Sequence, residues 1–254
     1  MLSITSRHQS ILNKLQEEGY VNVLDLCKAL DVSAVTIRKD LKLLEEKGLL
    51  FRSHGGASLS NPYINEKPVN EKEHIREEEK RRIGKAAAQL ITTDDTFIVA
   101  SGTTVLALAR YIKPAGRLTA ITASLNVALE LNRHLEIDVL QLGGALRKSS
   151  FSVAGSFSES MLENFSCSKL FLGIDGIDLD FGLSTTNILE AQLNKKMIVA
   201  AQKTIVLADS SKFGRRGFGK ICDLDEVDQI ITDKEAPEHD VKALEETGIE
   251  VTLV

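Results

Sequence analysis

The chain has 254 residues, of which 43% are hydrophobic and 26% are charged, and its formal net charge is −5. This composition fits a globular protein of one or two domains, and no run approaches the roughly 18–20 apolar residues that a membrane span needs. The N-terminus lacks the apolar core of a signal peptide, and three widely spaced cysteines suggest neither a zinc site nor a disulfide framework. We therefore predict a cytoplasmic protein with no membrane partner, no metal and no cofactor.

Apolar spacing in the first 48 residues predicts three short helices. Apolar side chains recur at helical spacing in residues 11–15 and again in residues 24–30. Gly19 ends the first helix, and Gly48 ends the third. Ser33 is a suitable N-cap for the third helix.

A β-hairpin is predicted directly after the third helix. Residues 49–51 and 57–59 can pair across the turn at 53–56, which contains two glycines. Three helices followed by such a hairpin, the wing, predict a winged helix-turn-helix domain over residues 1–59 that binds double-stranded DNA.

The predicted third helix has one apolar side and one polar side. Projected at 100° per residue, Ile37, Leu41 and Leu44 face a small core, whereas Lys39 and Lys42 lie opposite. An outward face of Lys, Arg and Thr suits a major-groove reader, although a lone helix with such a face is more often merely solvated. The wing and the three-helix spacing favour DNA binding. The candidate DNA contacts are Ser33, Thr36, Arg38, Lys39, Lys42, Arg52, His54 and Gly55.

Charge is distributed unevenly along the chain. The first 58 residues hold eight Lys or Arg and seven Asp or Glu, a net charge of +1, and the remainder carries −6. Non-specific DNA affinity depends on neutralising phosphates, so we expect it to be weak. Binding should be concentrated in the third helix and the wing.

The rest of the sequence predicts a linker and an α/β domain. Two prolines fall within residues 60–74, which we assign as the linker. From residue 96 onward strand-like and helix-like segments alternate, which predicts a mainly parallel sheet covered on both faces. We assign residues 75–254 to this second domain.

Several polar or glycine-rich turns follow the predicted strands, where parallel sheets bind ligands. Residues 101–104 could hold a phosphate at a helix N-terminus, or Thr103 could simply cap that helix. Gly143, Gly144 and Arg147 could approach an anion or form a flexible turn. Asp175 lies in an Asp-Gly turn, Lys212 could neutralise a phosphate, and Glu190 is either a capping partner or a sugar-hydroxyl contact. Together these turns favour a small anionic ligand. The residues singled out are Ser101, Gly102, Thr103, Thr104, Gly143, Gly144, Arg147, Asp175, Glu190 and Lys212.

At this point the chain resembles the DeoR family of bacterial sugar-metabolism repressors over nearly its whole length. Its N-terminal signature is specific, although the family often has Arg where Lys39 stands. The resemblance implies a second domain similar to ribose-5-phosphate isomerase that senses a phosphorylated sugar or polyol, a homodimer or homotetramer, and Ser124 as a further effector residue. The matching segments are Arg7 with Ile11, 32–41, 48–57, 102–104, 124–126, 142–147, 171–177, 208–213 and 231–233.

Two positions depart from the family pattern. Ala100 stands where the family usually has Asp, and Ala123 stands where it usually has Asn. Both polar groups would sit beside the expected ligand, so we predict an unusual hydroxyl pattern in the effector or a partial loss of sensing.

Two alternatives to a ligand-controlled repressor stay open. One is a ligand-independent DNA-binding protein whose large domain only oligomerises. The other is a sugar-phosphate isomerase with Asp175, Asp178 or Glu190 as general base, although nothing in the sequence forces a catalytic pair.

Overall fold

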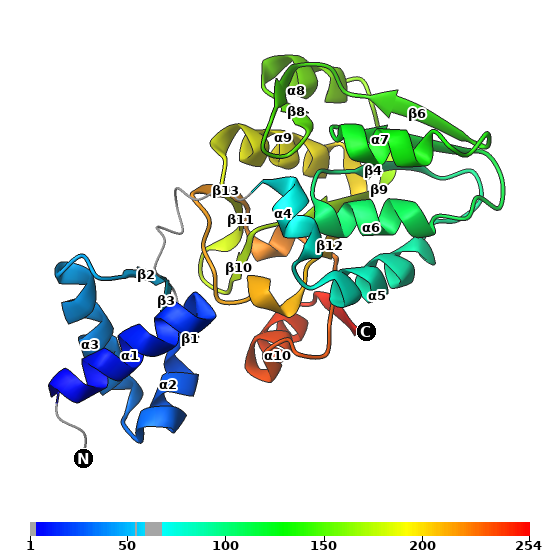
Figure 1. The fold of residues 1–254 in the computed structure, drawn as a ribbon. Coiled ribbons are helices and arrows are strands. Elements are labelled where there is room, and N and C mark those ends of the chain that lie inside the picture. Colours follow the sequence, from blue (N-terminus) through cyan, green and yellow to red (C-terminus); the bar gives the residue numbers. More distant parts are fainter. Residues whose placement is uncertain (1–3, 54, 59–67) are drawn as a thin grey trace.

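The computed structural model describes residues 4–53, 55–58 and 68–254 (Figure 1). The candidate DNA contact His54 and most of the predicted linker lie outside these ranges. The described part of the N-terminal region contains three helices and a small sheet whose strand order is β1-β3-β2. The elements are α1 (Ile4–Glu18), β1 (Tyr20–Asn22), α2 (Val23–Leu30), α3 (Ala34–Glu46), β2 (Phe51–Ser53) and β3 (Gly56–Ser58).

Short polar side chains set the starts of the second and third helices. Asn22 caps α2 by accepting a hydrogen bond from the backbone N–H of Leu24 at 2.7 Å. Ser33 caps α3 in the same way, accepting from the N–H of Thr36 at 3.3 Å. These bonds satisfy N–H groups that have no partner inside the helix.

The wing contains one strand more than a hairpin needs. β3 pairs antiparallel with β2 and also with β1, which precedes α2 in the chain. Gly56, expected in the turn, is instead the first residue of β3. A Cβ atom built there would lie 2.1 Å from the carbonyl oxygen of Val21, so only glycine fits the close approach of β1.

The C-terminal region is built on a seven-stranded sheet in which every neighbouring pair is parallel. The order β15-β14-β12-β9-β4-β5-β6 reverses between β4 and β9, because the chain goes first to one side of β4 and then to the other. This confirms the predicted fold class, a winged helix-turn-helix followed by a mainly parallel α/β domain. The strands are β4 (Thr96–Val99), β5 (Leu118–Thr122), β6 (Ile137–Gln141), β9 (Cys167–Gly173), β12 (Ala201–Leu207), β14 (Gln229–Thr232) and β15 (Glu250–Leu253).

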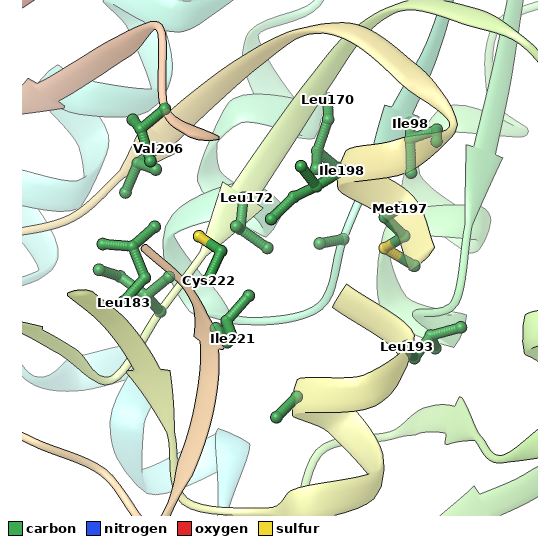
Figure 2. Close-up of a cluster of buried hydrophobic side chains, with 14 of the residues drawn as sticks. Ile98, Leu170, Leu172, Leu183, Leu193, Met197, Ile198, Val206, Ile221 and Cys222 are labelled. Carbon is green, nitrogen blue, oxygen red and sulfur yellow. The ribbon is translucent and has the colours of Figure 1, made fainter. Parts of the chain in front are cut away.

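Helices cover both faces of this sheet (Figure 1). On one face α5, α6 and α7 bury an apolar cluster that includes Phe97 and Phe171, whose rings meet edge to face. On the other face α9 contributes Leu193, Met197 and Ile198 to an apolar cluster that includes Ile98 and Leu170 of the sheet (Figure 2). The helices are α4 (Val69–His74), α5 (Glu77–Ala88), α6 (Thr103–Tyr111), α7 (Leu125–Leu131), α8 (Ser156–Leu162), α9 (Ile188–Val199) and α10 (Glu238–Glu246).

Two small sheets and two 3-10 turns were not predicted. Their strands have only three or four residues, too few to show a clear period of two. They extend two of the predicted glycine turns, so the Asp-Gly turn at Asp175 leads into β10 and the Gly143-Gly144 turn into β7. The elements are β7 (Ala145–Arg147) with β8 (Ser152–Ala154), the trio β10 (Gly176–Asp178), β11 (Gly182–Thr185) and β13 (Gly219–Cys222), η1 (Ser210–Lys212) and η2 (Leu224–Glu226).

Two of the three cysteines are buried thiols with a raised pKa. Cys167 and Cys222 are buried, and burial raises the pKa of Cys167 to about 11 and that of Cys222 to about 12. Cys27 is partly buried. Within the described residues, no helix is long and apolar enough to cross a membrane. The same residues contain no cluster of three or more His, Cys, Asp or Glu side chains that could hold a metal ion.

Candidate functional site

Helix α3 presents the polar face that its sequence predicts. Ile37, Leu41 and Leu44 are each at most 1% exposed and form part of the small core of the N-terminal domain. Arg38 and Lys39 are exposed on the outer side. The outer face is thus free of the side chains that hold the helix in place, as direct contact with DNA requires.

The other described DNA-contact candidates lie in α3, at its N-cap or in the wing. Lys42 is exposed, and its ammonium lies 3.9 Å from Glu46 one turn on. The Thr36 hydroxyl lies 3.0 Å from that of Ser33, so both hydroxyls sit at the N-terminal end of α3. Arg52 is tied back to Glu45, with 3.7 Å between guanidinium and carboxylate. Gly55 is exposed and has a φ of +79°, a conformation that favours glycine.

A buried charge cluster joins α1 to α3, and sequence reasoning missed its role. Asp40, 3% exposed, accepts hydrogen bonds from Arg7 Nη2 at 2.9 Å and from His8 Nε2 at 3.0 Å. Burial alone would raise the pKa of Asp40, but the bonds from Arg7 and His8 outweigh that effect and lower it. Arg7 and Asp40 both belong to the segments that resemble the DeoR family. Only the packing of α1 on α3 shows that they are partners.

A cavity opens at the carboxyl ends of β4 and β9, where the strand order of the sheet reverses. In open α/β sheets this crevice is the usual ligand position. Residues 101–104, which follow β4, and residues 173–175, which begin with the last residue of β9, form much of its wall. Seven of the residues predicted from sequence line it: Ser101, Gly102, Thr103, Thr104, Asp175, Glu190 and Lys212.

The cavity wall beside β4 is the N-terminal end of α6. Gly102, not Thr103, is the N-cap residue, with a φ of +124° and no side-chain cap. The simple capping role considered for Thr103 is therefore wrong. An uncapped helix N-terminus beside two hydroxyl side chains is suited to an anion, because backbone N–H groups and the helix dipole both favour negative charge.

Glu190 is held by side chains from two other segments. It accepts a hydrogen bond from the Ser101 hydroxyl at 2.9 Å and an ion-paired bond from Arg147 at 2.5 Å. The cap of α9 is made by Asn187 alone, which accepts from the N–H of Leu189 and of Glu190. The carboxylate of Glu190 is therefore a cavity group and not a capping partner.

Asp175 is the centre of a second charged cluster in the cavity. Its carboxylate accepts from Lys72 at 2.9 Å and from the Thr185 hydroxyl at 3.1 Å, and Lys212 lies 3.8 Å away. Burial alone would raise the pKa of Asp175, but the ammonium groups of Lys72 and Lys212 hold it well below the ordinary range. A carboxylate with so low a pKa is a weak proton acceptor, which does not suit a general base at neutral pH.

Three predicted effector residues have structural roles away from the cavity wall. Ser124 caps α7 by accepting from the N–H of Val127 at 3.4 Å. The carbonyl of Gly143 accepts from the Ser158 hydroxyl at 2.6 Å, and Gly144 has a φ of +143°. Sequence could not separate these turns from those on the cavity. Lining residues that the sequence did not suggest are Val69, Lys72, Ser149, Ser150, Gly173, Ile174 and Thr185.

The two departures from the family pattern are buried. Ala100 is 0% exposed and Ala123 is 2% exposed, and both belong to the apolar cluster under α9. Neither lines the cavity, although each directly precedes a serine of interest, Ser101 and Ser124. The prediction of an unusual effector or a partial loss of sensing stays a prediction.

A winged helix-turn-helix joined to an α/β domain with a ligand cavity defines a DNA-binding transcription regulator. Residues 7–62 match the DeoR-like helix-turn-helix domain, and residues 75–234 match the DeoR C terminal sensor domain. The chain belongs to the DeoR family of transcriptional regulators. Members of this family are not enzymes, so the isomerase alternative is excluded.

Relatives match this chain over nearly its whole length. A provisionally named aga operon transcriptional repressor of Escherichia coli O157:H7 is 39% identical over 98% of this chain and 94% of its own. The glycerol-3-phosphate regulon repressor of Escherichia coli K12 is 30% identical, with 98% of each chain covered. Among solved structures, ribose 5-phosphate isomerase A of Methanocaldococcus jannaschii shares 16% identity and a TM-score of 0.39 over 54% of each chain.

Proposed function

We propose that this protein represses a carbohydrate-utilisation operon and that a phosphorylated sugar or polyol in the cavity controls its operator affinity. The main support for this proposal is the cavity. It combines an uncapped helix N-terminus, the cations Lys72 and Lys212, and the carboxylates Asp175 and Glu190. The first two features suit a phosphate, and the carboxylates suit the hydroxyls of a sugar. One relative is named as a repressor of the glycerol-3-phosphate regulon and another as a repressor of the aga operon, and both names support a repressor that controls an operon.

On the DNA side, the proposal places α3 in the major groove. Arg38, Lys39 and Thr36 contact bases or phosphates, and Lys42 contacts the backbone. Arg52 and the wing turn, with His54 and Gly55, meet the DNA backbone or the minor groove. The outward exposure of Arg38 and Lys39 is the observation that supports this arrangement.

The proposal includes a homodimer or homotetramer, because helix-turn-helix proteins commonly bind two half-sites as symmetric oligomers. We expect light scattering after size exclusion to give at least twice the 27.8 kDa mass of one chain. A monomer mass at the concentration used for DNA binding would remove this part of the proposal.

Thermal unfolding of the purified protein tests the effector. The panel contains phosphorylated sugars and polyols, each paired with its unphosphorylated form. A ligand present at about 100 times its Kd adds about 2.7 kcal/mol to native stability, which shifts the midpoint measurably. We expect a shift with one phosphorylated compound and none with its free sugar. If no compound shifts the midpoint, the alternative in which the large domain only oligomerises becomes the better one.

A further inference from the structure

Helix α4 forms part of the cavity wall, although it lies within the segment assigned from sequence as linker. Val69 and Lys72 of α4 both line the cavity. The backbone N–H of Val69 donates to the carbonyl of Ser149 at 2.7 Å, and the Lys72 ammonium donates to Asp175 at 2.9 Å. Since Ser149 and Asp175 are lining residues themselves, α4 is attached to the cavity wall at two points.

The same short helix is attached to the elements behind the cavity. Glu73 pairs with Arg110 of α6 at 2.6 Å. Lys80 of α5, 6% exposed, donates to the backbone carbonyl of Lys72. Burial lowers the pKa of Lys80 to about 8, and the nearby Lys212 and Lys72 ammonium groups add to that effect. A change in the position of Lys72 therefore changes contacts on both sides of α4.

In the order of the chain, α4 lies between the DNA-binding domain and the rest of the sensor domain. The last strand of the DNA-binding domain ends at Ser58, and α4, beginning at Val69, is the next described element. Whatever moves α4 moves the point from which the DNA-binding domain is attached.

The charges around Asp175 allow Lys72 to change its ion-pair partner. One carboxylate, Asp175, has two ammonium groups near it, since Lys72 lies at 2.9 Å and Lys212 at 3.8 Å. A phosphate ester carries about −1.5 to −2 charges at neutral pH and has three acceptor oxygens. Such a group competes strongly with a single carboxylate for a lysine on the cavity wall.

We propose that Lys72 contacts the effector. The Lys72 ammonium group pairs with the ligand phosphate in place of Asp175, and this exchange of partners repositions α4. The inference rests on the proposed function and adds to it a residue that contacts the effector. Binding of the effector then acts on the DNA-binding domain through α4, the next described helix of the chain. Because the sensor match begins at residue 75, α4 lies outside the domain in which a ligand contact would be sought.

The test uses the full chain and inorganic phosphate, the group common to every proposed effector. Thermal shift at constant ionic strength gives the phosphate Kd, and hydrogen exchange reports on residues 69–74. We expect saturable binding to the wild type and a phosphate-dependent change in exchange of these residues. Lys72→Ala should raise the Kd about tenfold or more, the effect of losing one hydrogen bond between charged groups. It should also abolish the exchange response.

Two variants separate ligand contact from a general effect on stability. Lys72→Arg keeps a cation and should restore most of the affinity. Lys85→Ala removes an exposed lysine of α5 and should behave as the wild type. Equal phosphate binding by wild type and Lys72→Ala would overturn this inference alone. Absence of saturable binding by the wild type would overturn the proposed function and this inference with it.

Discussion

Asp40→Ala should abolish operator binding by unfolding the DNA-binding domain while the sensor domain stays folded. The substitution takes from the Arg7 guanidinium its carboxylate partner at Asp40, in a site where Asp40 is 3% exposed. Breaking a buried ion pair by removing one partner costs about 3–5 kcal/mol. A domain of this size has little stability to spare, because it buries a smaller fraction of its surface on folding than a larger domain does.

Calorimetry of the full chain measures this effect. The transition of the DNA-binding domain should move to much lower temperature, and that of the sensor domain should stay in place. Glu17→Ala, which removes an exposed carboxylate from α1, is the matched control and should leave both transitions unchanged. Unaltered unfolding and operator binding by Asp40→Ala would show that the cluster does not stabilise the domain.

The same cluster predicts a dependence of stability on pH. The folded pKa of Asp40 lies below the value of about 3.9 for an unfolded aspartate. Its contribution is therefore fully present above about pH 4 and is lost as the pH falls through the folded pKa. In urea unfolding, the stability difference between wild type and Asp40→Asn should narrow below about pH 4. A constant difference across that range would assign the stabilisation to another group.

The second large effect is expected from Arg38→Ala with Lys39→Ala. Both side chains are exposed on the outer face of α3, so removing them should leave the fold intact and weaken operator binding. A base-reading contact is worth about 1–3 kcal/mol and its loss relaxes specificity, whereas loss of a phosphate contact flattens the salt dependence. Fluorescence anisotropy with an operator selected from a random-sequence pool, measured over a range of salt, distinguishes the two roles.

Lys14→Ala is the control for this pair, because Lys14 lies on α1 and forms an ion pair with Glu18 at 3.7 Å. It should bind the operator as tightly as the wild type. Unchanged affinity and salt dependence in the double variant would remove α3 from the DNA interface.

Most of the fold could be predicted because it depends on patterns that are local in sequence. The three predicted N-terminal helices and the alternation of strands and helices after residue 96 are both observed. Strands of three residues such as β7 and β10 escaped prediction, since their pairing depends on partners elsewhere in the chain. The hairpin of the wing was predicted, but the pairing of its β3 strand with β1 was not.

The candidate cavity could be predicted only in part. Turns 101–104, Asp175 and Lys212 follow strands of the parallel sheet, so their meeting at one edge follows from the strand order. The turn at Gly143 and Gly144 also follows a strand, β6, but that strand is at the far edge of the sheet, away from the reversal between β4 and β9. Distance from the switch point is not visible in the sequence.

The sequence by itself determined the class of this protein: a capped α3 with an outward cationic face, a wing, and alternating strands and helices ending in polar turns. These features are local, because helix period, caps and glycine turns act over a few residues. Only the tertiary structure decided which polar groups are partners. Arg7 meets Asp40, Glu190 meets Arg147, and Lys72 reaches Asp175 across 103 positions of sequence. Such pairs form when packing brings distant elements together, and the identity of the residues alone does not specify the partner.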